Sequence, residues 1–199
     1  SMVTWYPEEE ELPAPLIRER EWNKTKAFME SYARSPGSCK ILHLYGENGN
    51  GKRFLIRHGA KACGLGLLVA DTSLMMGMTI AELDLMLQAL KLECRLTGSV
   101  LCFSEDRYSL GEDEESGPHR SFPTELDYLL KKIAAEWNFC IWIAGEKSAY
   151  LTKYPLHFMA LESPMLSVGE RIILWNAYAQ KYPLEEDVDL TLCANQYIL

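Results

Sequence analysis

Short apolar runs alternate with longer amphipathic segments along most of this chain. Runs at 41–45, 67–70, 100–103 and 139–144 read as strands, because almost every position in them is apolar. Helical periodicity follows at about 16–33, 53–62, 80–96, 123–136 and 168–181. Strands that are apolar on both faces are typical of a parallel sheet covered by helices. The pattern therefore predicts an α/β fold with three layers, in which helices cover both faces of a parallel sheet.

The same pattern divides the chain into three parts. Residues 1–37 hold an acidic run from Glu8 to Glu11, which we read as a solvated arm, and one amphipathic helix that ends before a Pro-Gly break. Residues 38–166 hold the alternating strands and helices and form the predicted core domain. Residues 167–199 begin with a further helix and form the third part.

Composition narrows the class of protein. With 199 residues, 48% of them hydrophobic, the chain can bury a substantial core. Its net charge of −8 argues against binding to nucleic acids or to anionic membranes. No apolar run approaches the length of a membrane span, and none of the six cysteines has a C-x-x-C partner, so we expect a cytoplasmic protein with reduced thiols. Ser1-Met2 favours an expression scar ahead of a native start or of a domain excised from a longer protein.

A glycine-rich stretch follows the first of these strands. Three glycines spread over six positions precede a lysine and the next helix, which is the spacing G-x-x-x-x-G-K of a phosphate-binding Walker A loop. Glycines let backbone N–H groups converge on a phosphate, while the helix N-terminus and the lysine supply positive charge. The candidate nucleotide-binding residues are Gly46, Glu47, Asn48, Gly49, Asn50, Gly51, Lys52 and Arg53.

Arg53 departs from this motif. The position usually carries a Ser or Thr whose hydroxyl holds Mg²⁺, and a guanidinium cannot ligate a cation. Two orientations are open: the Arg53 side chain either reaches the phosphates and replaces part of the metal's charge, or points outward as an ordinary residue of the first helical turn. Lys52 has an alternative role too, as a surface lysine beside a flexible turn.

A second candidate motif ends the third strand. Four apolar residues, 100–103, are followed by Ser104 and Glu105 where a Walker B pattern has Asp and Glu. In a phosphate-loop protein the Asp would hold Mg²⁺ through water, and the Glu would polarise the attacking water. Ser104 replaces the metal-holding group, while Glu105 keeps the catalytic position. Glu105 is therefore a candidate catalytic base or a relic of one, which then hydrogen-bonds only Ser104 or backbone.

These residues and their order resemble AAA+ ATPases over about residues 40–199. The stretch Ser104–Gly111 aligns with the family's Asp-Glu-Ala-Asp-Ala-Leu-Phe-Gly, and Glu125–Lys131 with its Asn-Tyr-Leu-Leu-Gln pattern. The next strand, 139–145, and the run Glu170–Trp175 at the start of the lid continue the match. The likeness is closest to bacterial AAA modules, some of them linked to contractile injection systems. It implies a P-loop core over 38–166, a truncated helical lid over 167–199, and bound ATP or ADP.

The chain departs from the family where the chemistry lies. Gly145 follows the fourth strand, where the family has a polar residue that orients water. The arginine pair that acts on a neighbour's nucleotide is missing, and the same stretch offers Lys147 and Lys153 instead. The segment 74–79, where relatives have an aromatic pore loop, is short and lacks an aromatic residue. These departures predict weak or absent ATP hydrolysis, and the loss of both magnesium-holding groups disfavours Mg²⁺.

We therefore expect an ATP- or ADP-binding, degenerate AAA+ module of a larger protein, which serves regulation or assembly beside other AAA+ domains or subunits. Three alternatives stay open: an active ATPase that uses Glu105 as its base, a scaffold that binds no nucleotide, and a phosphate-loop kinase for a small molecule that uses Lys153 or Arg171. His43, inside the first strand, reads as a satisfied core histidine. His119 and His157 have no companions at metal-ligand spacing, so we predict no metal site.

Overall fold

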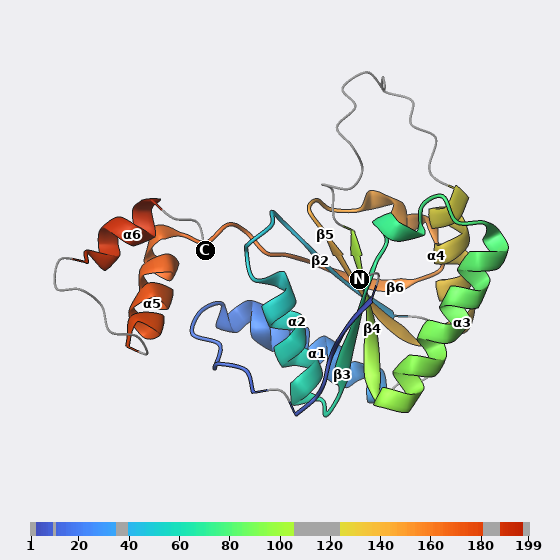
Figure 1. Ribbon diagram of the computed structural model, residues 1–199, viewed down its shortest axis with the longest axis horizontal. Coiled ribbons are helices and arrows are strands. Elements are labelled where there is room, and N and C mark those ends of the chain that lie inside the picture. The colour runs from blue at the N-terminus through green and yellow to red at the C-terminus, as the bar shows by residue number, and fades with distance from the viewer. Residues whose placement is uncertain (1–2, 10, 35–39, 106–123, 181–187, 197–199) are drawn as a thin grey trace, which may run out of the picture.

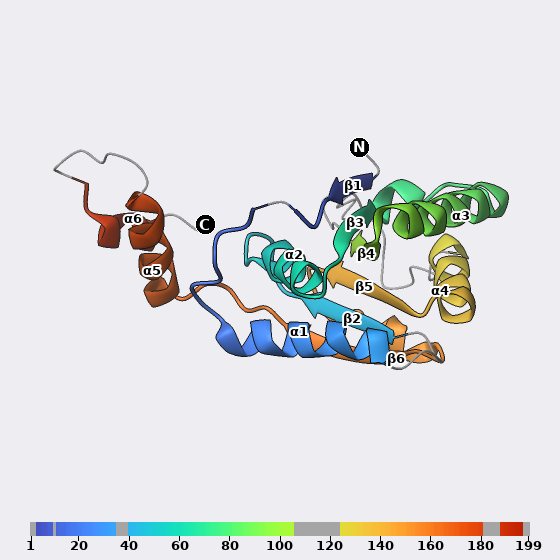
Figure 2. The ribbon, with the colours of Figure 1, turned by 90° about the horizontal axis from the view of Figure 1, so that it is seen from below.

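The computed structural model describes residues 3–9, 11–34, 40–105, 124–180 and 188–196. They form a six-stranded sheet with helices on both faces, and a pair of helices set apart at one end (Figures 1 and 2). The strands are β1 (Val3–Tyr6), β2 (Lys40–Tyr45), β3 (Gly66–Asp71), β4 (Ser99–Glu105), β5 (Phe139–Ala144) and β6 (His157–Glu162). The α-helices are α1 (Glu19–Arg34), α2 (Lys52–Ala62), α3 (Ile80–Thr97), α4 (Thr124–Glu136), α5 (Val168–Ala179) and α6 (Leu190–Gln196). Two short 3₁₀ helices, η1 (Ser73–Met75) and η3 (Ala149–Lys153), follow β3 and β5.

The sheet has the order β1-β3-β4-β5-β2-β6. Its neighbouring strands run parallel except β1, which pairs antiparallel with β3 along one edge. The predicted α/β class with helices on both faces is confirmed, but the prediction of a purely parallel sheet is wrong at this edge. The N-terminal part that we read as an arm contains this strand, which the sequence conceals because β1 has only four residues before Pro7.

Each face of the sheet has its own apolar core, because alternate residues of a strand point to opposite faces. Helices α1 and α2 cover one face, where the buried Ile56 shares a core with Leu42 of β2. Helices α3 and α4 cover the other face, where Leu87 shares a core with Trp142 of β5. The sheet is therefore the middle of three layers, as the apolar strands predicted.

Two connections leave the carboxyl ends of neighbouring strands on opposite faces of the sheet. From β2 the chain passes into α2, on the face that α1 also covers, whereas from β5 it passes through η3, whose Leu151 belongs to the core on the opposite face. Between β2 and β5 the connections therefore diverge at the carboxyl ends of the strands. Open α/β sheets bind their ligands at such a topological switch point. The glycine-rich loop follows β2 directly and lies there.

Most predicted helices and strands agree with the structure to within a few residues at their ends. Strand β6 and helix α6 were not predicted. Strand β6 is a half-exposed edge strand, and α6 has seven residues, so neither has the long regular pattern on which prediction depends.

Some expectations fall on other parts of the chain. Most of the stretch 104–111 and His119 lie outside the described residues. Cys63, Cys94, Cys102, Cys140 and Cys193 are free thiols in the described residues. None of the described helices has the length and apolar character that a membrane span requires.

His43 is buried in the middle of β2 and is fully paired, as predicted. Its Nε2 accepts from the backbone N–H of Ser148 at 3.0 Å, so its Nδ1 carries the proton and donates to Trp142 O at 3.2 Å. Burial lowers the pKa of His43 below its ordinary value of 6.5. The imidazole is therefore neutral in the folded protein at neutral pH, and it joins β2 to the turn after β5.

We predict that the protein loses stability as the pH falls below about 6.5. The unfolded chain then gains a proton on His43 that the folded chain does not, so the free energy of unfolding falls by at most about 1.4 kcal/mol per pH unit. Urea unfolding at about pH 7 and about pH 5.5 measures this loss, which should be smaller in His43→Gln. Part of it should remain, because burial also lowers the pKa of His58. An unchanged pH dependence in His43→Gln would contradict the prediction.

Candidate functional site

The loop between β2 and α2 requires its glycines. Gly46, Gly49 and Gly51 have φ angles of 136°, 83° and 83°, a range that other residues rarely adopt. Gly46 also has no room for a side chain, because a Cβ there would lie 2.1 Å from Ser163 O. Its N–H donates to Ala144 O at the end of β5. Each glycine of the motif therefore lies where the backbone conformation favours glycine over other residues.

Lys52, the first residue of α2, points back into this loop. It is 6% exposed, and its ammonium donates to Gly46 O, to Glu47 O at 2.8 Å and to Asn50 Oδ1 at 3.2 Å. The alternative of a surface lysine is therefore wrong. These three acceptors are neutral oxygens of the loop, so the ammonium of Lys52 lies inside the loop rather than in solvent.

The N-terminus of α2 differs from that of the helices that begin with capping boxes. Gly51 caps α2 in a left-handed conformation without a side-chain hydrogen bond, and the first turn holds no acid. In α3 and α5 the carboxylates of Glu82 and Glu170 complete capping boxes instead. The positive end of α2 therefore has no carboxylate of its own helix beside it, and it shares this place with Lys52 and Arg53.

Arg53 turns toward the end of β4. Its Nη2 lies 3.3 Å from Ser104 Oγ, and both residues line a cavity of about 460 Å³ together with loop residues 48–52. Of the two orientations that the sequence left open, the structure therefore has the inward one. The two residues that replace the expected magnesium-holding groups contact each other.

This corner of the site does not fit Mg²⁺. A cation beside Ser104 Oγ would meet the positive charge of the Arg53 guanidinium. Within the described residues, no three His, Cys, Asp or Glu side chains are grouped so that they could hold a metal ion. Arg53 and Lys52 bring positive charge to this cavity, which Glu105 also lines.

Glu105 is held by donors from β5 and the turn that follows it. Its Oε2 accepts from Trp142 Nε1 at 3.2 Å, from Ser148 Oγ at 3.1 Å and from Tyr150 Oη at 2.6 Å. Burial, and then the charge of Glu105, raise the pKa of Tyr150, so the phenol keeps its proton and donates. We expected Ser104 or backbone as partners of a relic carboxylate, whereas the partners in the structure are these three side chains. All three bonds are to Oε2, so they fix the orientation of the carboxylate against β5 and the turn after it.

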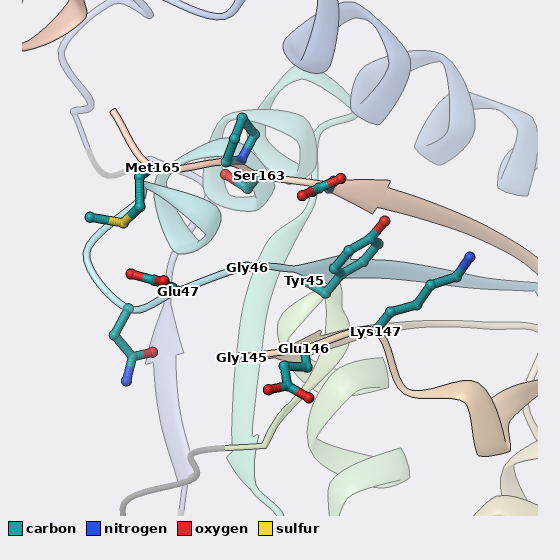
Figure 3. A pocket seen from close by; sticks show the side chains of 11 residues that line it. Tyr45, Gly46, Glu47, Gly145, Glu146, Lys147, Ser163 and Met165 are labelled. Carbon is teal, nitrogen blue, oxygen red and sulfur yellow. The ribbon is translucent and has the colours of Figure 1, made fainter. Parts of the chain in front are cut away.

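A larger cavity of about 810 Å³ lies on the other side of the loop (Figure 3). It opens where β2, β5 and β6 end, and Gly46 runs between Ser163 on one side and Gly145 on the other. Asn48 lines both cavities. The charged residues that line the larger cavity are Glu47, Glu146, Lys147 and Glu162.

Arg18, which directly precedes α1, holds the glycine loop through hydrogen bonds from a different part of the chain. Its side chain is 6% exposed, and its Nη1 donates to Asn50 O and to Ser163 Oγ at 2.7 Å each. Its Nη2 donates to Pro164 O, and its Nε lies 3.4 Å from Glu170 Oε1. We call this set of contacts the Arg18 fork. It joins the N-terminal segment to the glycine loop, to the segment after β6 and to α5.

Sequence reasoning found the loop but missed the fork. Arg18 lies in a stretch that we read as the first turn of a helix. Among the described residues other than glycine, it is the one with a positive φ angle, 61°. Ser163 follows the unpredicted strand β6. Neither residue belongs to a sequence motif, so no local signal could have found them. Lys153 and Arg171, which a kinase reading would use, are not among the described residues that line either cavity.

Comparison with known proteins assigns no family to this geometry, because no family model matches the chain and no curated protein matches it.

We predict that Gly46→Ala destabilises the protein more than Gly51→Ala. Both residues have positive φ, so alanine costs about 1–2 kcal/mol of backbone strain at each position. A new Cβ would also collide with Ser163 O at Gly46, whereas nothing lies within 4 Å of one at Gly51. We expect a total loss of about 3 kcal/mol or more for Gly46→Ala. Equal losses of the two variants in urea unfolding would show that close packing at Gly46 is unimportant.

We predict that Arg18→Gln lowers the free energy of unfolding by about 2–4 kcal/mol. The buried acceptors Asn50 O and Ser163 Oγ lose a charged donor in this variant. Arg20→Gln, at an exposed position of α1, is the matched control and should change stability by less than about 0.5 kcal/mol. If urea unfolding gives the same stability for both variants, the Arg18 fork does not hold the loop.

Proposed function

We propose that this protein binds ATP or ADP, with the phosphates on loop residues 46–53 and the ammonium of Lys52. The observation that carries the proposal is the glycine loop at the switch point of the sheet, beside a helix N-terminus without a carboxylate of its own. Such positions bind phosphate groups in α/β proteins. The resemblance of the motifs to AAA+ ATPases supports a nucleotide as the anion.

Lys52 and Arg53 give this binding a charge-based driving force. When a phosphate arrives, the ammonium of Lys52 exchanges the neutral acceptors Gly46 O, Glu47 O and Asn50 Oδ1 for charged oxygens. Hydrogen bonds between charged partners are roughly twice as strong as neutral ones. Arg53 adds a second cation at the cavity beside Ser104, where the terminal phosphate would lie. The larger cavity has room for the nucleoside.

We propose that hydrolysis is weak or absent. The carboxylate of Glu105 is engaged by three side chains, and β5 ends in Ala144 and Gly145, which have no polar side chain to orient a water. The inward Arg53 takes the charge role that Mg²⁺ has in active relatives. The protein then acts as a degenerate AAA+ module, in regulation or assembly beside other AAA+ domains or subunits, and it binds neither nucleic acid nor membrane.

We predict that ATP and ADP raise the melting temperature in the absence of Mg²⁺. At a ligand concentration of about 100 times Kd, binding adds about 2.7 kcal/mol of stability, which corresponds to about 5–10 °C for a chain of this size. Lys52→Met should remove most of this shift, because it deletes the buried cation of the loop. Lys24→Met, at an exposed position of α1, is the matched control and should keep the shift. Added Mg²⁺ should not increase it.

This titration and two activity assays separate the alternatives. No shift with ATP, ADP or GTP, with or without Mg²⁺, would overturn the proposal and favour a scaffold that binds no nucleotide. Steady phosphate release that disappears in Glu105→Gln would favour an active ATPase instead. Product formation that requires an added metabolite would favour a small-molecule kinase.

A further inference from the structure

Helix α3 is apolar on two opposite faces. One face is buried against the sheet and carries Leu83, Leu87 and Leu90. On the opposite face Leu85, Leu92 and Leu96 are 67%, 58% and 74% exposed. At 3.6 residues per turn, the exposed Ala81 and Ala89 fall on the same line as these leucines. We call Ala81, Leu85, Ala89, Leu92 and Leu96 the α3 stripe.

The fold of a single chain does not explain the α3 stripe. A helix on the surface of a monomer normally has a polar outer face. Helix α4, which covers the same face of the sheet (Figures 1 and 2), follows this rule. Its exposed positions are Thr124, Lys131, Ala135 and Glu136. A helix that is apolar on opposite faces is instead typical of one that lies between two packed layers.

We propose that the α3 stripe binds the α3 stripe of a second copy of this protein, with the two helices antiparallel and related by a two-fold axis near Ala89. Such an interface requires a surface that is complementary to itself. In an antiparallel pair centred near Ala89, Leu96 lies against Ala81 of the second copy, and Leu85 lies against Leu92 of the second copy. Large residues therefore meet small ones at both ends, and leucines meet between the ends and the axis.

The flanks of the stripe carry charges of both signs. Asp84 and Arg95 lie on one flank, near opposite ends of α3, so an antiparallel pair brings Arg95 of each copy toward Asp84 of the other, which also pairs with Lys132 of its own chain. On the other flank the antiparallel pair brings Glu82 toward Glu93, so the direction rests chiefly on the fit of large against small residues. The helix dipoles oppose each other favourably in the antiparallel pair. This interface is independent of any nucleotide on the glycine loop.

Sedimentation velocity over an about 100-fold range of protein concentration tests the proposal, because a dimer forms by mass action. Wild type should change from monomer to dimer within this range, and Leu92→Glu should move the transition to at least about tenfold higher concentration. Leu192→Glu is the matched control, since Leu192 on α6 is 53% exposed, and it should leave the transition unchanged. Circular dichroism should give the same melting temperature for both dilute variants, because both leucines are exposed.

Disulfide cross-linking tests the direction of the helices. Ala89→Cys places two thiols near the two-fold axis, so it should give a cross-linked dimer on oxidation. In an antiparallel pair the two residues at position 96 lie about 20 Å apart, so Leu96→Cys should give no more cross-linking than wild type with its own cysteines. A protein that stays monomeric, a dimer that Leu92→Glu does not weaken, or efficient cross-linking of Leu96→Cys would each overturn the proposal.

Discussion

The buried guanidinium of Arg18 joins segments that are far apart in the sequence. Arg18 precedes α1, yet it donates to Asn50 O in the glycine loop and to Ser163 Oγ after β6, and it pairs with Glu170 at the start of α5. A buried cation of this kind is costly to remove, because buried acceptors then lose a charged donor. The shape of the loop, the path of the chain after β6 and the position of α5 are therefore coupled. A ligand on the loop would be felt at α5 through this one side chain.

The loop itself is organised by positive charge. Lys52 gathers neutral oxygens of the loop around its ammonium, and Arg53 contacts Ser104 at the end of β4. Positive charge is thus built into the protein beside the end of β4. A guanidinium stabilises negative charge but does not activate a water. Glu105, next in the chain after Ser104, is held against Trp142, Ser148 and Tyr150.

Features with a local signal could be predicted from the sequence, and features that depend on distant contacts could not. The apolar strands and the glycine spacing are local, so the α/β class and the loop 46–53 were found. The edge strands β1 and β6 and the helix α6 are short or half-exposed, so their patterns are weak. Residues such as Arg18 and Ser163 act through contacts that form only when the chain has folded. The identity of Glu105 was visible, but its partners follow from the pairing of β4 with β5.

The order of the strands also sets the order in which the molecule can be assembled during translation. Strands β3 and β4, with α3 between them, are neighbours in the sequence and pair directly. Strand β2 pairs in the described sheet with β5 and β6, which leave the ribosome roughly 100 residues later. Pairings of such long sequence separation form slowly. The glycine loop therefore emerges early but acquires its final shape late, because Ser163, which contacts Gly46 and Asn50 through the folded chain, is translated only after β6.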